Sequence, residues 1–273
     1  MERSVEAFFV NDYTLILNAA EARIQIVLSR EGTFVCAEEW SAPSQGTELL
    51  TPVLADMLRR LNMRPKDITR IACVAGPGSF TGLRLVLTTA AAFRRVTGAE
   101  VAALSTLHAL AASLPGGLLP NSDDAVRVRV VTHARRGLVH GQDFLCGSGL
   151  PIPVGEPAMW QIETACMDPL PRFMIGSGVA RNLNFFRERL AERKECRLLP
   201  GDFDQPTPRA LLALTAALPE TAWERQDITP LYLRPCDAVD NLASIAGKRG
   251  QNPEEAYAEL NRLLAPISPS QIH

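Results

Sequence analysis

The residues best suited to chemistry gather in the nonapeptide at residues 76–84, where three glycines, Ser79 and Thr81 follow an apolar run. Glycine adopts backbone angles that other residues disfavour, and Ser79 or Thr81 can cap a following helix. A helix N-terminus beside such a turn points free N–H groups outward and can hold an anion. The stretch lacks the lysine of the Walker pattern, and its glycines are spaced too widely for G-x-G-x-x-G. A phosphate site and a tight turn whose glycines avoid clashes both remain open.

The sequence offers no complete set of residues for hydrolysis. Ser79 lies in a sharp turn that resembles a nucleophile elbow, but Thr81 stands where G-x-S-x-G needs its second glycine. The four histidines form neither an H-E-x-x-H nor an H-x-x-x-H pair, and the six cysteines include no C-x-x-C. The histidines are His108, His133, His140 and His273. We therefore expect no catalytic residue and no metal ligand.

Composition bounds the class of protein. The chain has 273 residues, of which 47% are apolar, so it can bury a sizeable core. The chain has 28 Lys and Arg residues and 30 Asp and Glu residues, a balance that argues against binding nucleic acid by charge alone. A role beside an RNA-binding partner stays open. No apolar run approaches the ~20 residues that a spanning helix needs. The start of the chain has no signal-like apolar core, so we expect a cytoplasmic protein with no membrane contact.

Periodicity predicts a mixed α/β sheet that is followed by a second group of strands and helices. A loop at 115–124, rich in Pro, Gly, Asn and Asp, separates the two groups. Strands are expected at 13–17, 23–28, 33–37, 71–75, 101–104, 126–131, 138–144 and 172–175. Helices are expected at 47–62, 83–96, 107–113, from the glycines near 177 to about 193, at 208–218 and at 253–264.

The first two predicted helices suggest a docking face. The apolar residues of the first cover roughly 180° of its surface, whereas a helix on a sheet needs a stripe of about 100°. The surplus faces either a neighbouring helix of the same chain or another protein. The second helix carries small residues at 88–92 that allow close approach. The candidate interface residues are Leu49, Leu50, Val53, Leu54, Met57, Leu83, Leu87, Ala90 and Ala91.

The nonapeptide closely resembles the signature of the TsaB (YeaZ) family. Weaker matches to the family lie before the nonapeptide at 45–52 and after it at 104–111, 134–137 and 230–234, in the family's order. The resemblance therefore covers most of the chain. It implies a two-lobed actin-like ATPase fold (the ASKHA, RNase H-like class) with mixed sheets flanked by helices. We expect an N-terminal lobe with the docking helices at 1–106, a C-terminal lobe at 107–235, and a tail with a helix at 236–273.

The same resemblance implies a non-catalytic role in making N6-threonylcarbamoyladenosine in tRNA. Such a chain pairs with TsaD, the transferase, and is joined by TsaE, an ATPase; alone it forms a homodimer, and it meets tRNA only through the complex. An older label for the family is M22 glycoprotease-like. No cofactor is expected, although ATP or ADP could bind at the partner interface. The candidate nucleotide contacts are Gly76, Gly78, Ser79, Thr81, Gly82 and Arg84.

Several positions depart from the family pattern. Asn18 stands where members usually have the aspartate of a phosphate-facing turn, and Leu104 precludes a His-x-x-x-His pair with His108. These changes weaken the enzyme alternative, an M22-like metalloprotease or ATPase. Arg135 and Arg136 support a third hypothesis, a small-molecule site, although a solvated turn explains them as well. Further replacements lie at His133, Leu138 and His140.

Overall fold

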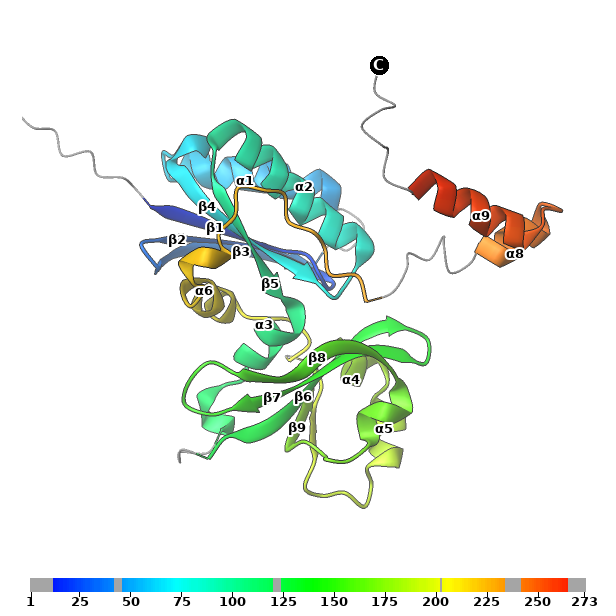
Figure 1. The fold of residues 1–273 in the computed structure, drawn as a ribbon. Helices are drawn as coiled ribbons and strands as arrows, with labels where there is room; N and C mark the ends of the chain where they lie inside the picture. The colour runs from blue at the N-terminus through cyan, green and yellow to red at the C-terminus, as the bar shows by residue number, and fades with distance from the viewer. Residues whose placement is uncertain (1–11, 42–45, 120–123, 202, 234–241, 265–273) are drawn as a thin grey trace, which may run out of the picture. The chain divides into compact units, whose positions relative to one another are not determined.

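The computed structural model describes residues 12–41, 46–119, 124–201, 203–233 and 242–264 (Figure 1). They form two compact units, one that ends at Leu233 and one that comprises residues 242–264. The smaller unit contains two helices, α8 (Leu242–Lys248) and α9 (Pro253–Leu264), which pack against each other. The larger unit contains two five-stranded sheets. The predicted division of this larger unit at residue 106 stays a prediction.

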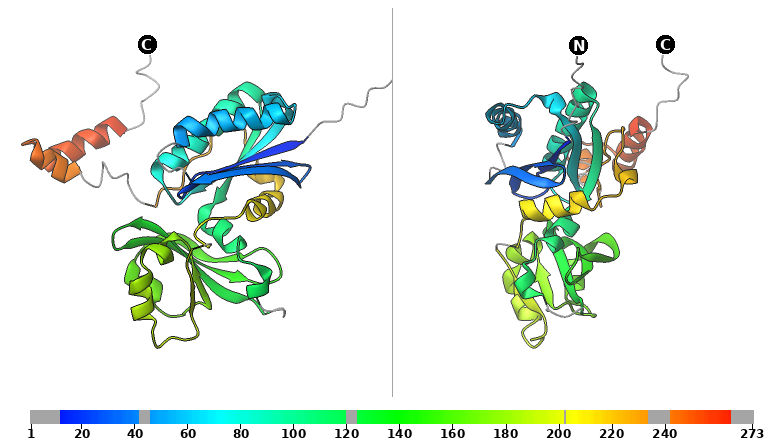
Figure 2. Two further views of the ribbon diagram at one scale, coloured as in Figure 1. Left: turned by 180° about the vertical axis from the view of Figure 1, so that it is seen from behind. Right: turned by 90° about the vertical axis from the view of Figure 1, so that its left-hand side faces the viewer.

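The first sheet is mixed, with strand order β3-β2-β1-β4-β5. Hairpins make β1, β2 and β3 antiparallel, and β4 and β5 run parallel to β1. Alternate strand residues face two helical layers, with α1 and α2 on one face and α3 and α6 on the other (Figure 2). The strands are β1 (Tyr13–Asn18), β2 (Arg23–Arg30), β3 (Thr33–Ser41), β4 (Ile68–Gly76) and β5 (Glu100–Ser105). The helices are α1 (Gly46–Arg60), α2 (Phe80–Thr97), α3 (Thr106–Ala112) and α6 (Pro208–Ala216).

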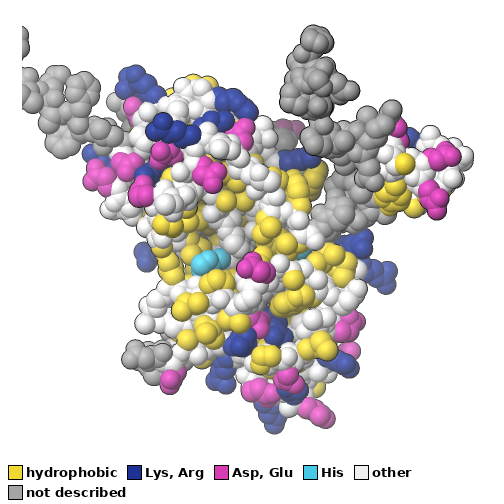
Figure 3. Space-filling view, viewed as in Figure 1, with side chains coloured by type: hydrophobic (Ala, Val, Ile, Leu, Met, Phe, Trp, Pro, Cys, Tyr) yellow, Lys and Arg dark blue, Asp and Glu magenta, His cyan; other side chains and the backbone are white. Residues whose placement is uncertain are grey.

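The second sheet has the order β10-β9-β6-β7-β8. An antiparallel meander of β6, β7 and β8 is extended by β9 and β10, which run parallel to β6. One face packs against α3, and the other against α4 and α5. Figure 3 shows hydrophobic side chains scattered among charged ones on this part of the molecule. Its elements are β6 (Val126–Arg135), β7 (Leu138–Cys146), β8 (Ile152–Gln161), β9 (Phe173–Ile175), β10 (Arg197–Leu199), α4 (Ser177–Arg181) and α5 (Leu183–Arg189).

The chain crosses between the two sheets twice, and α3 contacts both of them. Ala109 packs with the first sheet, whereas Leu107 and Leu110 pack with the second. The return crossing is fixed by a hydrogen bond from the Thr207 N–H to Ser113 Oγ (2.8 Å). Ser105 caps α3 by accepting from the His108 N–H (3.3 Å).

The predicted mixed α/β class is confirmed, with differences in detail. The sequence did not predict β8, since Pro153, Pro157 and a left-handed Gly155 (φ 73°) interrupt its pattern. An edge strand tolerates such residues because one side needs no ladder hydrogen bonds. The single helix expected after residue 177 is two short helices, which meet at Asn182. The short β10 and α8 were also not predicted.

Candidate functional site

The nonapeptide turn joins β4 to α2 and lies directly against the turn between β1 and β2. A Cβ on Gly82 would lie 1.8 Å from the Ala19 carbonyl oxygen, and one on Gly78 would lie 2.3 Å from that of Ala20. The Ser79 N–H donates to the same Ala20 oxygen at 2.7 Å. The glycines of this loop therefore leave room for another backbone, as expected of a close-packed turn.

Ser79 serves the helix rather than a reaction. Its Oγ accepts from the Gly82 N–H (3.3 Å), and its carbonyl accepts from the Leu83 N–H (2.8 Å). These are the bonds of a helix N-cap. Two N–H groups that an anion would need, those of Ser79 and Gly82, already have protein acceptors. Of the candidate nucleotide contacts, Ser79, Thr81 and Arg84 are exposed. Nucleotide binding there stays a prediction.

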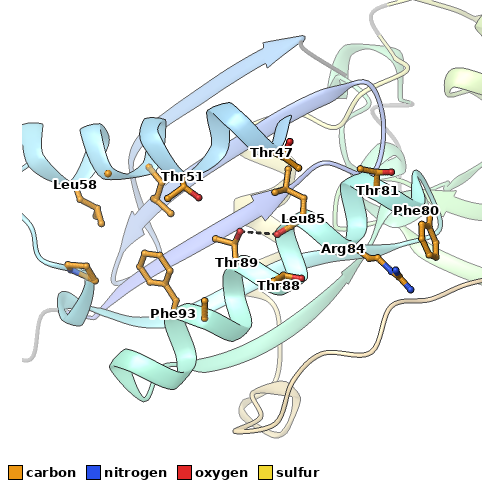
Figure 4. Close-up of a pocket in the computed structure, with 14 residues that line it drawn as sticks. Thr47, Thr51, Leu58, Phe80, Thr81, Arg84, Leu85, Thr88, Thr89 and Phe93 are labelled. Carbon is orange, nitrogen blue, oxygen red and sulfur yellow. Dashed lines mark hydrogen bonds between the residues drawn. The ribbon is translucent and has the colours of Figure 1, made fainter. Parts of the chain in front are cut away.

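A groove of about 850 Å³ runs between α1 and α2 (Figure 4). Its floor is apolar and includes Leu54, Leu58 and Phe93. Threonine side chains from both helices line it as well, and the Thr89 hydroxyl donates to the Leu85 carbonyl at 2.9 Å, so that its polar group is satisfied within α2. The threonines are Thr47, Thr51, Thr81, Thr88 and Thr89. The groove therefore offers mainly apolar contact to a partner.

The predicted interface residues lie beside this groove, but most face inward. The side chains of Leu50, Met57 and Leu83 are at most 2% exposed and belong to the chain's own core. The wide apolar arc of α1 is thus largely used by packing on the sheet and on α2. Also buried are Leu54, Leu87 and Ala90, whereas Leu49, Val53 and Ala91 are half-buried. The exposed residues that line the groove are Thr47, Thr51, Ala55, Pro65, Phe80, Thr81, Arg84, Thr88 and Ala92. Small and hydroxyl side chains do not stand out in an apolar-periodicity search, although the stretch at 88–92 signalled close approach.

A strap formed by residues 219–233 returns along this lobe and ends beside the groove. It pairs with β5 through Glu224 and Val101, whose N–H groups each donate to the other's carbonyl at 2.8 Å. Asp227 binds Arg94 and Arg95 of α2 at 2.8 and 2.7 Å. The Leu231 N–H then donates to the Ala75 carbonyl at 2.8 Å. The strap therefore holds its C-terminal residues against the start of α2.

Asn18, where the family pattern has aspartate, takes part in a buried hydrogen-bond network. Its amide donates to Gln25 Oε1 at 2.6 Å, and its oxygen accepts from the Ala20 N–H at 3.0 Å. Gln25 donates in turn to Glu39 (2.6 Å) and to the Pro206 carbonyl (2.7 Å). Both polar atoms of Asn18 are thus used to fix the β1–β2 turn and the return crossing.

The histidines and arginines singled out in the sequence do not converge. His108 bonds the Pro151 carbonyl at 2.8 Å and stacks on Phe144, and burial lowers its pKa. The His140 ring lies 3.4 Å from Thr132 Oγ1 inside the second sheet. Arg136 is exposed in the β6–β7 turn. Among the described residues, no three metal-binding side chains come together. Leu138 and His133 lie on the strands that flank the same turn, and His273 lies outside the described residues.

Glu21 is a residue that the sequence did not indicate. Burial raises the pKa of its carboxyl to about 7, although a hydrogen bond with Ser177 and the charge of Arg181 act against this and Asp204 acts with it. One of its oxygens is buried without a hydrogen-bond partner. Because Ser177 begins α4, this carboxyl joins the β1–β2 turn to a helix that packs on the second sheet.

We predict that Glu21 makes the protein less stable as pH rises. Its folded pKa lies above the usual value of 4.5, so its contribution is complete below about pH 4.5 and is lost as pH passes 7. Glu21→Gln should remove this dependence and raise the free energy of unfolding at pH 8 by up to about 3 kcal/mol. Urea denaturation at pH 5 and pH 8 measures it. The exposed Glu156→Gln is the control, and equal pH slopes for wild type and Glu21→Gln would refute the prediction.

The two mixed sheets, each flanked by helices and joined by two crossings, define a two-lobed actin-like ATPase fold. A family model described as TsaD, tRNA N6-adenosine threonylcarbamoyltransferase, matches residues 41–140. The tRNA threonylcarbamoyladenosine biosynthesis protein TsaB of Bacillus subtilis is 28% identical over 120 residues, which are 43% of this chain and 52% of that protein. This match therefore spans about half the length of the relative.

Solved structures agree on the fold. YeaZ from Pseudomonas aeruginosa superposes with a TM-score of 0.66 at 23% identity, covering 81% of this chain and all of that one. A second P. aeruginosa structure, described as similar to peptidase YEAZ, gives the same TM-score and identity and covers 82% of this chain. The resemblance of this chain to the TsaB (YeaZ) family is confirmed. Across the described residues, no helix has the length and apolar character to cross a membrane.

Proposed function

We propose that this chain supports the formation of N6-threonylcarbamoyladenosine in tRNA as a non-catalytic subunit that binds and activates a TsaD-like transferase. The observation that carries the proposal is the open apolar groove between α1 and α2. The stretch matched by the transferase family model contains both helices, and the B. subtilis relative bears the name of this pathway. A TsaE-like ATPase would join the pair, tRNA would be met through the complex, and the work would take place in the cytoplasm.

The side chains that could have been catalytic make structural contacts instead, and this supports a non-catalytic role. Ser79 caps a helix, Asn18 holds a turn, and His108 packs between α3 and the β7–β8 loop. Each of these polar side chains hydrogen-bonds within the fold. In the absence of the transferase, a second copy of this chain would cover the same groove. This accounts for the homodimer that we expect of the isolated protein.

A charge placed in the groove tests the proposal. Ala92 is exposed, lines the groove and lies on α2, so Ala92→Glu should keep the helix while introducing an unpaired charge into the interface. We expect the Kd for the transferase of the same organism to rise by about 100-fold, or ~2.7 kcal/mol. Calorimetry with both full-length proteins measures it, and a reconstituted reaction should lose tRNA modification in parallel.

The matched control lies four residues further along the same helix. Val96 is 82% exposed and does not line the groove, so Val96→Glu should bind within about threefold of wild type. Equal binding by Ala92→Glu and wild type would place the interface elsewhere. Hydrolysis of ATP or of a peptide by the purified chain alone would contradict the non-catalytic role.

A further inference from the structure

A stack of three side chains closes one end of the groove. The rings of Phe80 and Tyr232 lie 5.3 Å apart between centroids, with their planes inclined by 30°. The guanidinium carbon of Arg84 lies 3.9 Å from the centroid of the Phe80 ring. Figure 4 shows Phe80 and Arg84 beside each other at the start of α2. Phe80 and Tyr232 remain 37% and 40% exposed, and Arg84 is exposed, so the stack is accessible to another molecule.

Arg84 differs in its charge environment from the other arginines of α2. Among the described residues that line the groove, it alone carries a charge. Arg94 and Arg95, about three turns further along the helix, both bind Asp227 of the strap. Within the described ranges of the chain, no carboxylate lies at ion-pair distance from the Arg84 guanidinium. Among the described residues, the groove therefore carries one positive charge at one end, without a carboxylate at ion-pair distance, and has apolar walls along its length.

The stack also orients this charge. A guanidinium that lies over an aromatic ring has its plane fixed, and its N–H edge stays available for two parallel hydrogen bonds. A carboxylate matches that edge in geometry and charge. Holding the plane in advance lowers the entropy lost when the carboxylate binds. Aromatic residues and arginine are also the residue types that most often dominate binding energy at interfaces.

We propose that Arg84 is the anchor for a carboxylate of the docking partner, and that the groove receives a partner helix with an apolar face and an Asp or Glu at the end that meets Phe80 and Tyr232. The inference rests on the proposed function and adds the chemistry of the partner surface. A groove between two helices accepts an amphipathic helix as its natural occupant. The single cation at one end then sets the direction in which that helix lies.

Binding of the full-length chain to its transferase partner, measured by calorimetry, tests the anchor. Removing one member of a buried charged pair typically weakens binding by 30-fold or more, so Arg84→Ala should raise the Kd by about that factor. Arg84→Lys keeps the charge but loses the flat fork, and it should restore only part of the affinity. Arg59→Ala is the control, because Arg59 is an exposed arginine of α1 that pairs with Asp56 and does not line the groove.

Each outcome has a separate meaning. If wild type and the transferase do not bind, the proposed function fails. If they bind and Arg84→Ala binds equally well, the carboxylate anchor is overturned while the proposed function stands. The titrations are repeated with saturating ADP, because a nucleotide phosphate is the competing occupant. A defect of Arg84→Ala that appears only with ADP would assign the arginine to a phosphate and overturn the anchor. Thermal unfolding of each variant shows that it remains folded.

Discussion

Replacing Arg129 by methionine should lower the free energy of unfolding by about 3–5 kcal/mol, because the buried carboxylate of Asp143 loses its bidentate partner and several buried carbonyls lose their donor. Arg129 is 5% exposed, and its Nε and Nη2 bind the two oxygens of Asp143 at 2.7 and 2.9 Å. It also donates to the carbonyls of Ala165, Met167 and Pro169 at 2.9 to 3.0 Å. One side chain thus joins β6 and β7 to the segment before β9.

Urea denaturation followed by circular dichroism measures this loss. Arg127→Met is the matched control: Arg127 binds the same Asp143 at 3.0 Å but is partly exposed, so its loss should cost only about 1 kcal/mol. The order of the two variants is the decisive result. If both cost the same, the carbonyl contacts of Arg129 contribute nothing beyond the ion pair, and the explanation is wrong.

Gly82→Ala should destabilise the protein by more than about 3 kcal/mol, the range reached when backbone strain and overpacking combine. Helix propensity alone predicts the opposite sign, since alanine in a helix is favoured over glycine by roughly 0.5–1 kcal/mol. The new Cβ would lie 1.8 Å from the Ala19 carbonyl oxygen, and a backbone atom cannot rotate away as a side chain does. The β1–β2 turn and the start of α2 must therefore move apart.

The midpoint of thermal unfolding gives the sign of this effect directly. Gly116→Ala is the control, because no atom lies within 4 Å of a Cβ at that position and its stability should change by less than about 0.5 kcal/mol. A rise in the midpoint for Gly82→Ala would mean that the close contact relaxes at little cost. Crowding by the β1–β2 turn would then not be the reason for a glycine at position 82.

The elements that sequence predicted best are those with a local signal. The hairpin of β6 and β7 follows from alternating residues around Gly137, and α9 was predicted at its observed bounds. β8 was not predicted because its prolines are tolerated only in a strand at the edge of a sheet. Which strand lies at the edge depends on how the whole sheet is assembled. The break at Asn182 has no Gly or Pro to mark it.

The candidate site was predicted in part, for a similar reason. The nonapeptide was recognisable, because three glycines in a short turn require an unusual backbone. What those glycines face was not, since Ala19 and Ala20 lie far from them in sequence. The apolar arc of α1 shows the limit of periodicity: it measures how much surface a helix hides, and it does not distinguish the chain's own core from a partner. Glu21 could not be found from sequence, because its raised pKa comes chiefly from burial in the folded chain, with smaller effects of Ser177, Arg181 and Asp204 from distant segments.

The strap has a consequence for the order in which the chain is made. Both helices of the groove are complete once residue 97 has been synthesised, but Tyr232, which supports Phe80, is added 135 residues later. A growing chain on the ribosome therefore carries an unfinished groove, whose cationic end lacks its outer aromatic layer, until nearly all of the larger unit has been translated. Partner capture through that end is a property of the finished polypeptide, and this timing separates folding of the lobe from assembly of the complex.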